Sequence, residues 1–215
     1  MLTKNGDFIE IEFIARTKED NKIFDLTNEK AAKENNLYDK KKDYSPAIIC
    51  LGHNDVLPGL DKQLINKDLG KYVFEIKSDE AFGKKDANLI KLIPTEVFTK
   101  QNMKPVPGLH VNLDGIFGLI RSVSGGRTII DFNHPLSSRD LIYEVEIKRF
   151  IVNIEEKVNA VLKLVKKDVK FKLNNEILSI DLKIDDKKNE YLKEEIKKRV
   201  PEIKEIRFEK TTTPE

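Results

Sequence analysis

Three stretches of the chain alternate apolar and charged residues, although they lie far apart in the sequence. They span residues 8–14, 71–77 and 141–151. Alternation of this kind has the period of a β-strand with one buried face, so each stretch is expected to form a half-buried strand. The third stretch resembles the first two more than it resembles the residues just before it. The pattern therefore predicts one β domain that is interrupted by an inserted segment.

The interrupting segment is built from shorter apolar pieces that Pro and Gly residues separate. These pieces are residues 89–93, 97–98, 111–119 and 128–132. Short strand-like pieces with turn residues between them are typical of a small β-rich module. We therefore expect an inserted β-rich domain at residues 86–131, and a first domain made of residues 1–85 and 132–152.

The last third of the chain has a mixed pattern. Apolar residues from 158 to 165 repeat with the helical period, two alternating stretches follow at residues 169–173 and 177–184, and a second helical stretch ends before Pro201. This predicts an α-β-β-α-β domain at residues 153–215. A core of about 60 residues is only marginally stable alone. The domain is therefore expected to pack on a neighbouring domain or on a second copy of itself, as in a homodimer.

Composition limits the setting in which such a chain works. Of the 215 residues 35% are charged, the net charge is +2, and there is a single cysteine. No apolar run approaches the roughly 20 residues of a transmembrane helix, and one cysteine suits a reducing compartment. We expect a cytoplasmic protein without a membrane partner. Nucleic-acid binding through the basic residues 166–167 and 197–199 is a weaker alternative, because neighbouring acids offset them and a solvated helix face explains both.

The reactive side chains do not form a conventional catalytic centre. His53, His110 and His134 are isolated, Cys50 lies in an apolar run, and no phosphate-binding glycine loop is present, so no metal and no cofactor are expected. Rotation about an X-Pro bond needs no nucleophile, and its barrier is about 18–20 kcal/mol. A gain of about 3–4 kcal/mol would bring it to an ordinary turnover. An apolar pocket with one or two hydrogen bonds is able to supply that gain, although aromatic residues on strands more often form core.

Four motifs that follow one another in order resemble a known family. They are F-I-A-R-T-K-E-D-N-K-I-F-D-L-T at residues 13–27, L-G-H-N-D-V-L-P-G-L-D at 51–61, S-D-E-A-F-G at 78–83 and D-F-N-H-P-L at 131–136. Together they resemble the FKBP-type peptidyl-prolyl cis-trans isomerases, and the last resembles the SlyD-like branch, which carries a chaperone domain in its flap. The final domain is similar to that of long archaeal members. The resemblance implies an α+β fold, with an FKBP-like antiparallel half-barrel sheet around a short helix.

The resemblance also implies a pocket for the prolyl ring. In the family pattern Asp25 matches a carboxylate at the pocket edge, and Val56 and Leu57 match a pair whose backbone contacts the bound peptide. Leu60 stands where drug-binding members have a Trp platform, and Phe82 stands in the A-Y/F-G loop, so tight macrolide binding is not expected. The implied pocket residues are Phe13, Asp25, Val56, Leu57, Leu60, Phe82 and Tyr143.

The family implies a prolyl isomerase that also acts as a chaperone on unfolded polypeptides containing X-Pro bonds. In that interpretation the insert captures the client chain and the pocket isomerises it. The alternative is a chaperone or adaptor module whose isomerase site is vestigial. The expected client-binding residues are apolar residues of the insert, some of which must form its own core: Leu89, Ile93, Val97, Phe98, Ile116, Phe117 and Ile129.

Overall fold

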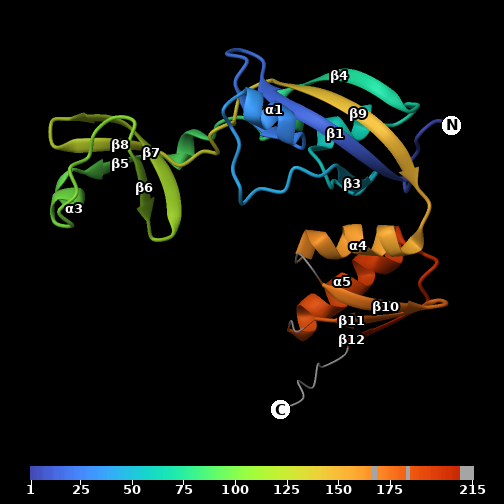
Figure 1. Cartoon of the computed structure of the whole chain (residues 1–215). Coiled ribbons are helices and arrows are strands. Elements are labelled where there is room, and N and C mark those ends of the chain that lie inside the picture. Colours follow the sequence, from blue (N-terminus) through green and yellow to red (C-terminus); the bar gives the residue numbers. More distant parts are fainter. Residues whose placement is uncertain (166–168, 183–184, 209–215) are drawn as a thin grey trace. The chain divides into compact units, whose positions relative to one another are not determined.

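A computed structural model describes residues 1–165, 169–182 and 185–208 of the chain. These residues form helices and mainly antiparallel sheets, which confirms the predicted α+β class (Figure 1). The contacts divide the chain into two compact units. Unit 1 comprises residues 1–15, 23–74 and those from 143 onward, and unit 2 comprises residues 16–22 and 75–142.

The first sheet joins the strands predicted from distant parts of the sequence. Its strands are β1 (Phe8–Thr17), β2 (Ile23–Leu26), β3 (Ala47–Cys50), β4 (Gly70–Ile76) and β9 (Leu141–Ile151). Their order is β2-β1-β9-β4, and β3 pairs with β1 in antiparallel register, so that Phe8 faces Cys50. The three alternating stretches are therefore neighbours in one sheet, as their shared pattern indicates.

Two short helices accompany this sheet. Helix α1 (Glu29–Glu34) begins where the Asn28 side chain accepts a hydrogen bond from the Ala31 amide, which satisfies one free donor of the first turn. Helix α2 (Pro58–Gln63) begins with Pro58, whose fixed φ suits the first helical position. Leu60 and Leu64, in α2 and at its end, are fully buried, so this short helix contributes to the core.

The second sheet belongs to unit 2 and has the order β5-β8-β7-β6. Its strands are β5 (Ile90–Pro94), β6 (His110–Leu113), β7 (Ile116–Ser124) and β8 (Arg127–Asp131), and all neighbouring strands are antiparallel. The predicted piece 111–119 is divided between β6 and β7, because Asp114 and Gly115 both have positive φ and form a tight hairpin turn.

One predicted strand piece of the insert is wrong. Residues 97–98 lie in α3 (Glu96–Thr99), where the Lys100 amide donates to the Glu96 carbonyl. Two apolar residues are too few to reveal a period, so the pattern could not distinguish strand from helix here. Phe98 from this helix packs against the sheet residues Val111, Ile120 and Ile130 and forms the core of the insert.

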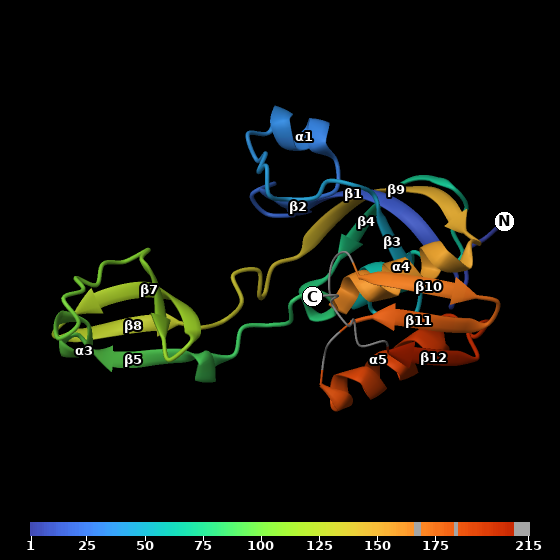
Figure 2. The same cartoon turned by 60° about the horizontal axis from the view of Figure 1, so that its bottom comes forward.

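The final region has the element order that its pattern predicts. It contains α4 (Ile154–Val165), β10 (Lys170–Asn174), β11 (Ile177–Asp181), α5 (Asp186–Arg199) and β12 (Glu205–Phe208). Figure 2 shows β10, β11 and β12 side by side, with β11 and β12 parallel and joined through α5. The predicted strand at 177–184 ends at Asp181, and its residues 183–184, like the basic pair 166–167, lie outside the described residues.

The core of this final region extends into the first sheet. Phe8 of β1, Cys50 of β3 and Ile151 of β9 belong to the same buried cluster as the apolar residues of α4, α5 and the third sheet. The interpretation of residues 197–199 as a solvated basic face is wrong at Arg199, which is 8% exposed. The expectation that the C-terminal domain packs on a neighbouring domain therefore agrees with the contacts inside unit 1.

In the ranges that the structure describes, no helix has both the length and the apolar character needed to span a bilayer.

Candidate functional site

An aromatic cluster lies at the centre of the first sheet. The ring of Tyr143 in β9 lies 5.7 Å from that of Phe13 in β1 and 6.2 Å from that of Phe24 in β2, the second pair meeting edge to face. Tyr143 is buried, whereas Phe13 and Phe24 are half-buried. Offset and edge-to-face rings attract each other beyond the effect of burial alone. Two of the seven implied pocket residues, Phe13 and Tyr143, are thus in direct proximity.

Asp25 adds a charge beside this cluster. Its Oδ1 accepts hydrogen bonds from the Leu26 amide at 2.9 Å and from Lys42 Nζ at 2.6 Å. Burial raises the pKa of the Tyr143 phenol, and the negative charge of Asp25 raises that pKa further. The phenol therefore remains protonated at neutral pH and keeps its hydrogen for donation. A cavity of about 130 Å³ opens here, lined by Ile23, Phe24, Asp25, Leu26, Leu37, Lys42 and Tyr44.

The loop between β3 and α2 is held by a buried carboxylate. Asp61 of α2 accepts from the amide of Gly52 at 3.0 and 3.1 Å and from the amide of Asn54 at 3.1 Å. Gly52 and Asn54 have φ values of 83° and 56°, a conformation that favours Gly and Asn. Val56 and Leu57 follow this turn and are half-buried. The loop that carries two implied pocket residues is therefore fixed by the first turn of the next helix.

A larger groove of about 340 Å³ lies among β1, β4 and β9. Charged residues supply much of its lining, including Glu12, Lys71, Glu144 and Glu146. Glu144 directly follows Tyr143, and neighbouring side chains of a strand project from opposite faces. The candidate site is therefore assigned to the face that carries Tyr143, although Phe13 also borders this groove. No group of three potential metal-ligating side chains occurs within the described parts of the chain.

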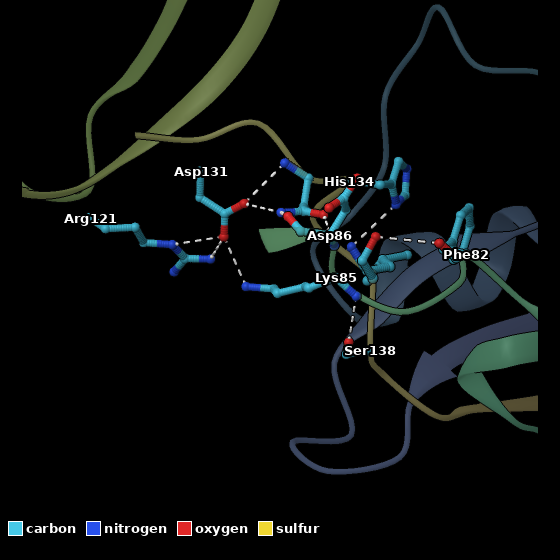
Figure 3. A network of polar contacts seen from close by, with 10 residues as sticks. Phe82, Lys85, Asp86, Arg121, Asp131, His134 and Ser138 are labelled. Atoms are coloured by element: carbon cyan, nitrogen blue, oxygen red, sulfur yellow. Dashed lines mark hydrogen bonds and ion pairs between the residues drawn. The ribbon is translucent and has the colours of Figure 1, made fainter. Parts of the chain in front are cut away.

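Phe82 lies in unit 2, close to where the chain enters the insert. Its ring stacks on the imidazole of His134, with 4.2 Å between the ring centroids and 10° between the planes. The Phe82 carbonyl accepts from Ser137 Oγ, and the Lys85 amide donates to Ser138 Oγ at 2.8 Å (Figure 3). The two chain segments that enter and leave the insert are thus tied to each other.

Asp131 is the centre of this connection. Figure 3 shows Lys85 and Arg121 converging on its carboxylate, at 2.9 Å from Lys85 Nζ and 2.8 Å from Arg121 Nη2. Its other oxygen accepts from the amide and the side chain of Asn133. Burial alone would raise the pKa of Asp131, but hydrogen bonds from Lys85, Asn133 and Arg121 outweigh burial and hold this pKa well below its usual range. Asp131 therefore stays ionised and holds three partners together.

We predict that Asp131→Asn lowers the free energy of unfolding by about 2 kcal/mol at pH 7, because charge-assisted hydrogen bonds are lost around a buried group. A lowered carboxyl pKa stabilises the fold above the ordinary carboxyl pKa of about 4, and this stabilisation is lost as the pH falls further. The difference between the two proteins should therefore shrink below pH 4 in denaturant titrations. Asp79→Asn is the matched control, since Asp79 is exposed and pairs with exposed Lys84. Equal losses in both variants would contradict the assignment.

The apolar residues predicted to bind clients differ in their exposure. Phe117 is 73% exposed and Ile116 is 61% exposed, while Leu89 and Val97 are about two-fifths exposed. Phe98 is fully buried in the insert core, so its prediction as a client-binding residue is wrong. Sequence alone could not separate these residues, because all of them are apolar and lie in short pieces.

The sheet register identifies an apolar outer face on the insert. Leu92 faces Ile129 across β5 and β8, and Ile93, on the opposite side of β5, packs on the core. Leu92 is 57% exposed and Ile129 is half-buried. Phe117 alternates with Gly118, where a Cβ atom would collide with the side chain of Ile130 in the core, so Phe117 also belongs to the outer face. Leu92 is not among the residues predicted from the sequence. It directly precedes Ile93 in a strand, so the alternation of side chains could have assigned it to the face opposite the core.

Comparison with known proteins places this chain in a family. The family model described as FKBP26, IF domain, matches residues 91–136. The chain is 28% identical over 148 residues to the short-type peptidyl-prolyl cis-trans isomerase of Methanocaldococcus jannaschii, covering 68% of this chain and 93% of that protein. It is 31% identical over 115 residues to a probable FKBP-type 16 kDa peptidyl-prolyl cis-trans isomerase of Pseudomonas fluorescens, covering 51% of this chain and 75% of that protein. The FKBP-type peptidyl-prolyl cis-trans isomerase SlyD of Haemophilus influenzae is 25% identical over 134 residues, covering 60% of this chain and 70% of that protein.

The chain belongs to the FKBP-type peptidyl-prolyl cis-trans isomerases.

The FKBP pocket pattern is divided between the two units of the structure. Phe13, Asp25, Tyr143 and the 56–60 segment with Val56, Leu57 and Leu60 lie in unit 1, and Phe82 lies in unit 2. The structure brings Phe13 and Tyr143 into proximity and places the Asp25 charge within reach of Tyr143. Leu60 is fully buried in this FKBP member, as expected for a residue that also forms core.

Proposed function

We propose that this chain catalyses the cis–trans isomerisation of X-Pro bonds by binding the prolyl segment at the aromatic site of unit 1. The observation that carries the proposal is the cluster of Phe13, Phe24 and Tyr143 with the Asp25 carboxylate beside it. Membership of the FKBP family supports the same reaction. Val56, Leu57 and Leu60 complete the proposed pocket on the side of α2, and a pocket role for Phe82 stays a prediction from the family pattern.

The proposed mechanism requires no reactive side chain. The planar X-Pro amide owes its barrier of about 18–20 kcal/mol to charge-separated resonance, which water stabilises. An apolar aromatic pocket excludes water and disfavours this charge separation, so the bond rotates more readily. The protonated Tyr143 phenol and the peptide groups of residues 56–57 supply hydrogen-bonding groups that orient the segment. Asp25 is paired with Lys42 in the free protein, so a ligand that bonds to this carboxylate competes with the lysine.

Replacing the two clustered rings should remove catalysis. We expect Phe13→Ala combined with Tyr143→Ala to lower kcat/KM on a short X-Pro peptide by about 100-fold, which corresponds to about 2.7 kcal/mol of transition-state stabilisation. Turnover is measured in a protease-coupled assay, and circular dichroism checks that the variant is folded. Tyr191→Ala and His110→Ala are the controls, because one lies exposed on α5 and the other on the insert. Full turnover in the double variant would show that catalysis does not use this pocket.

We further propose that the insert is a client-binding domain with its own apolar surface. The domain division that goes with this proposal is 1–85 with 132–152, 86–131, and 153–215, with a half-barrel sheet in the first of these. The match of residues 91–136 to an IF-domain family and the exposure of Leu92 and Phe117 support it. Large exposed apolar side chains on one sheet face are typical of protein-binding surfaces. A homodimer through the C-terminal domain stays a prediction.

If the insert binds clients and the pocket isomerises X-Pro bonds, suppression of aggregation and peptide turnover should be separable by mutation. Leu92→Ser combined with Phe117→Ser should abolish suppression of aggregation of an unfolded protein, because both side chains are exposed and contribute little to the fold. Turnover of a short X-Pro peptide should stay within about twofold, because a short peptide needs only the pocket. Tyr191→Ser is the matched control, as Tyr191 is 61% exposed on α5. A parallel loss of both activities would mean that the insert builds the pocket instead of capturing clients.

A further inference from the structure

We propose that Arg199 of the C-terminal region is a positioning residue for the isomerase pocket. It binds Asp55, the residue immediately before Val56 and Leu57, and so fixes the loop that presents these two residues to the peptide. The inference rests on the proposed pocket function.

The ion pair joins segments that are 144 residues apart in the chain. Arg199 Nη1 lies 2.8 Å from Asp55 Oδ1, and each side chain is only 7% exposed. Arg199 Nη2 lies 2.8 Å from Glu195 Oε2, one turn earlier in α5. The other oxygen of Asp55 accepts from the Cys50 amide at 2.8 Å. The guanidinium is therefore anchored within its own helix, and the carboxylate that it binds is anchored to the end of β3.

Because the pair is buried, the loss of either partner is strongly unfavourable. Burial raises the pKa of the Asp55 carboxyl, and the Cys50 amide together with the Arg199 guanidinium offset part of that effect. Removing one partner of a buried ion pair leaves an uncompensated charge in a poorly solvated place, which is strongly unfavourable. Without Arg199, Asp55 would gain by moving toward solvent, and the adjacent residues 56–57 would move with it.

The loop has two anchors that come from different regions. Asp61 of α2 holds the amides of Gly52 and Asn54, and the Leu57 carbonyl accepts from the amides of Leu60 and Asp61. These contacts fix the first half of the loop and its last residue. Asp55 lies between them, and its carboxylate bonds to the Cys50 amide at one oxygen and to Arg199 at the other. The middle of the loop therefore depends on a residue of the C-terminal region.

Apolar contacts also join the two regions. Phe8, Cys50 and Ile151 already share a buried cluster with Val200 and Ile203, which flank Pro201 after α5. A buried ion pair often adds little stability over a well-packed apolar pair, but it imposes direction and distance on its partners. The Arg199–Asp55 pair is therefore better suited to align the loop between β3 and α2 than to attach the C-terminal region to the first sheet.

The test compares kcat and KM for a short X-Pro peptide in the full-length protein and in variants. Arg199→Met should raise KM about tenfold and change kcat less than about twofold, because misplaced backbone groups weaken peptide binding. Arg199→Lys should recover much of the loss, since it keeps the charge. Asp55→Asn should raise KM in the same way, and adding Arg199→Met to it should have little further effect because the pair is already broken.

Two controls separate positioning from loss of docking. Leu178→Ala, a fully buried core residue of β11, should lower stability but leave KM unchanged. Cys50 is fully buried and burial raises its thiol pKa to about 12, so its reaction with a thiol reagent reports opening of the shared core. Labelling of Cys50 in Arg199→Met should stay as slow as in the unaltered protein. Faster labelling, or an equal rise of KM in Leu178→Ala, would overturn the positioning role.

Failure of the inference and failure of the proposed function give different results. An unchanged KM in Arg199→Met, with normal turnover by the unaltered protein, overturns the inference alone. Absence of turnover in the unaltered protein overturns the proposed function. In that case the backbone amide shifts of residues 56–57 decide the inference, because these residues should move in Arg199→Met but not in Leu178→Ala. Unchanged shifts in Arg199→Met would overturn it.

Discussion

Two buried carboxylates determine the path of the chain between β3 and α2. Asp61 accepts hydrogen bonds from the amides of Gly52 and Asn54, and Asp55 accepts from the Cys50 amide and from Arg199. This loop is neither strand nor helix, so its buried amides need hydrogen-bond acceptors outside a regular backbone pattern. The positions of the residues that follow the loop, and with them one side of the proposed pocket, depend on these two side chains.

The parts of the fold that depend on local periodicity could be predicted from the sequence. The alternating stretches form β1, β4 and β9, and the helical stretches of the last third form α4 and α5. The role of Arg199 could not be predicted, because it stands in a Lys-Lys-Arg run that is typical of a solvated helix face. Its partner Asp55 lies 144 residues away, and no spacing rule connects residues so distant. The same limit explains why Phe98 is predicted at a surface although it forms core.

The resemblance identified candidate pocket residues that physical patterns alone could not. Phe13 and Tyr143 lie in different strands, and only the strand order β1-β9 makes them neighbours. In the insert, the residues of the outer face are likewise identified only by the pairing register of its strands. Leu92 and Ile129 are paired across β5 and β8, which sequence alternation could suggest only once the pairing was known. Asp131, which ties both ends of the insert together, likewise has a structural role that depends on contacts with Lys85 and Arg121, and these contacts are visible only in the structure.

The most direct test of the proposed pocket is to map the backbone amide shifts of the full-length protein during titration with a short X-Pro peptide. The shifts should concentrate at residues near Phe13, Asp25, Val56, Leu57 and Tyr143, with little change along the outer face of the insert. Saturable shifts confined to β5, β7 and β8, with none in the 50–57 loop or the aromatic cluster, would contradict it. That result would place peptide binding on the insert and leave the aromatic cluster as core.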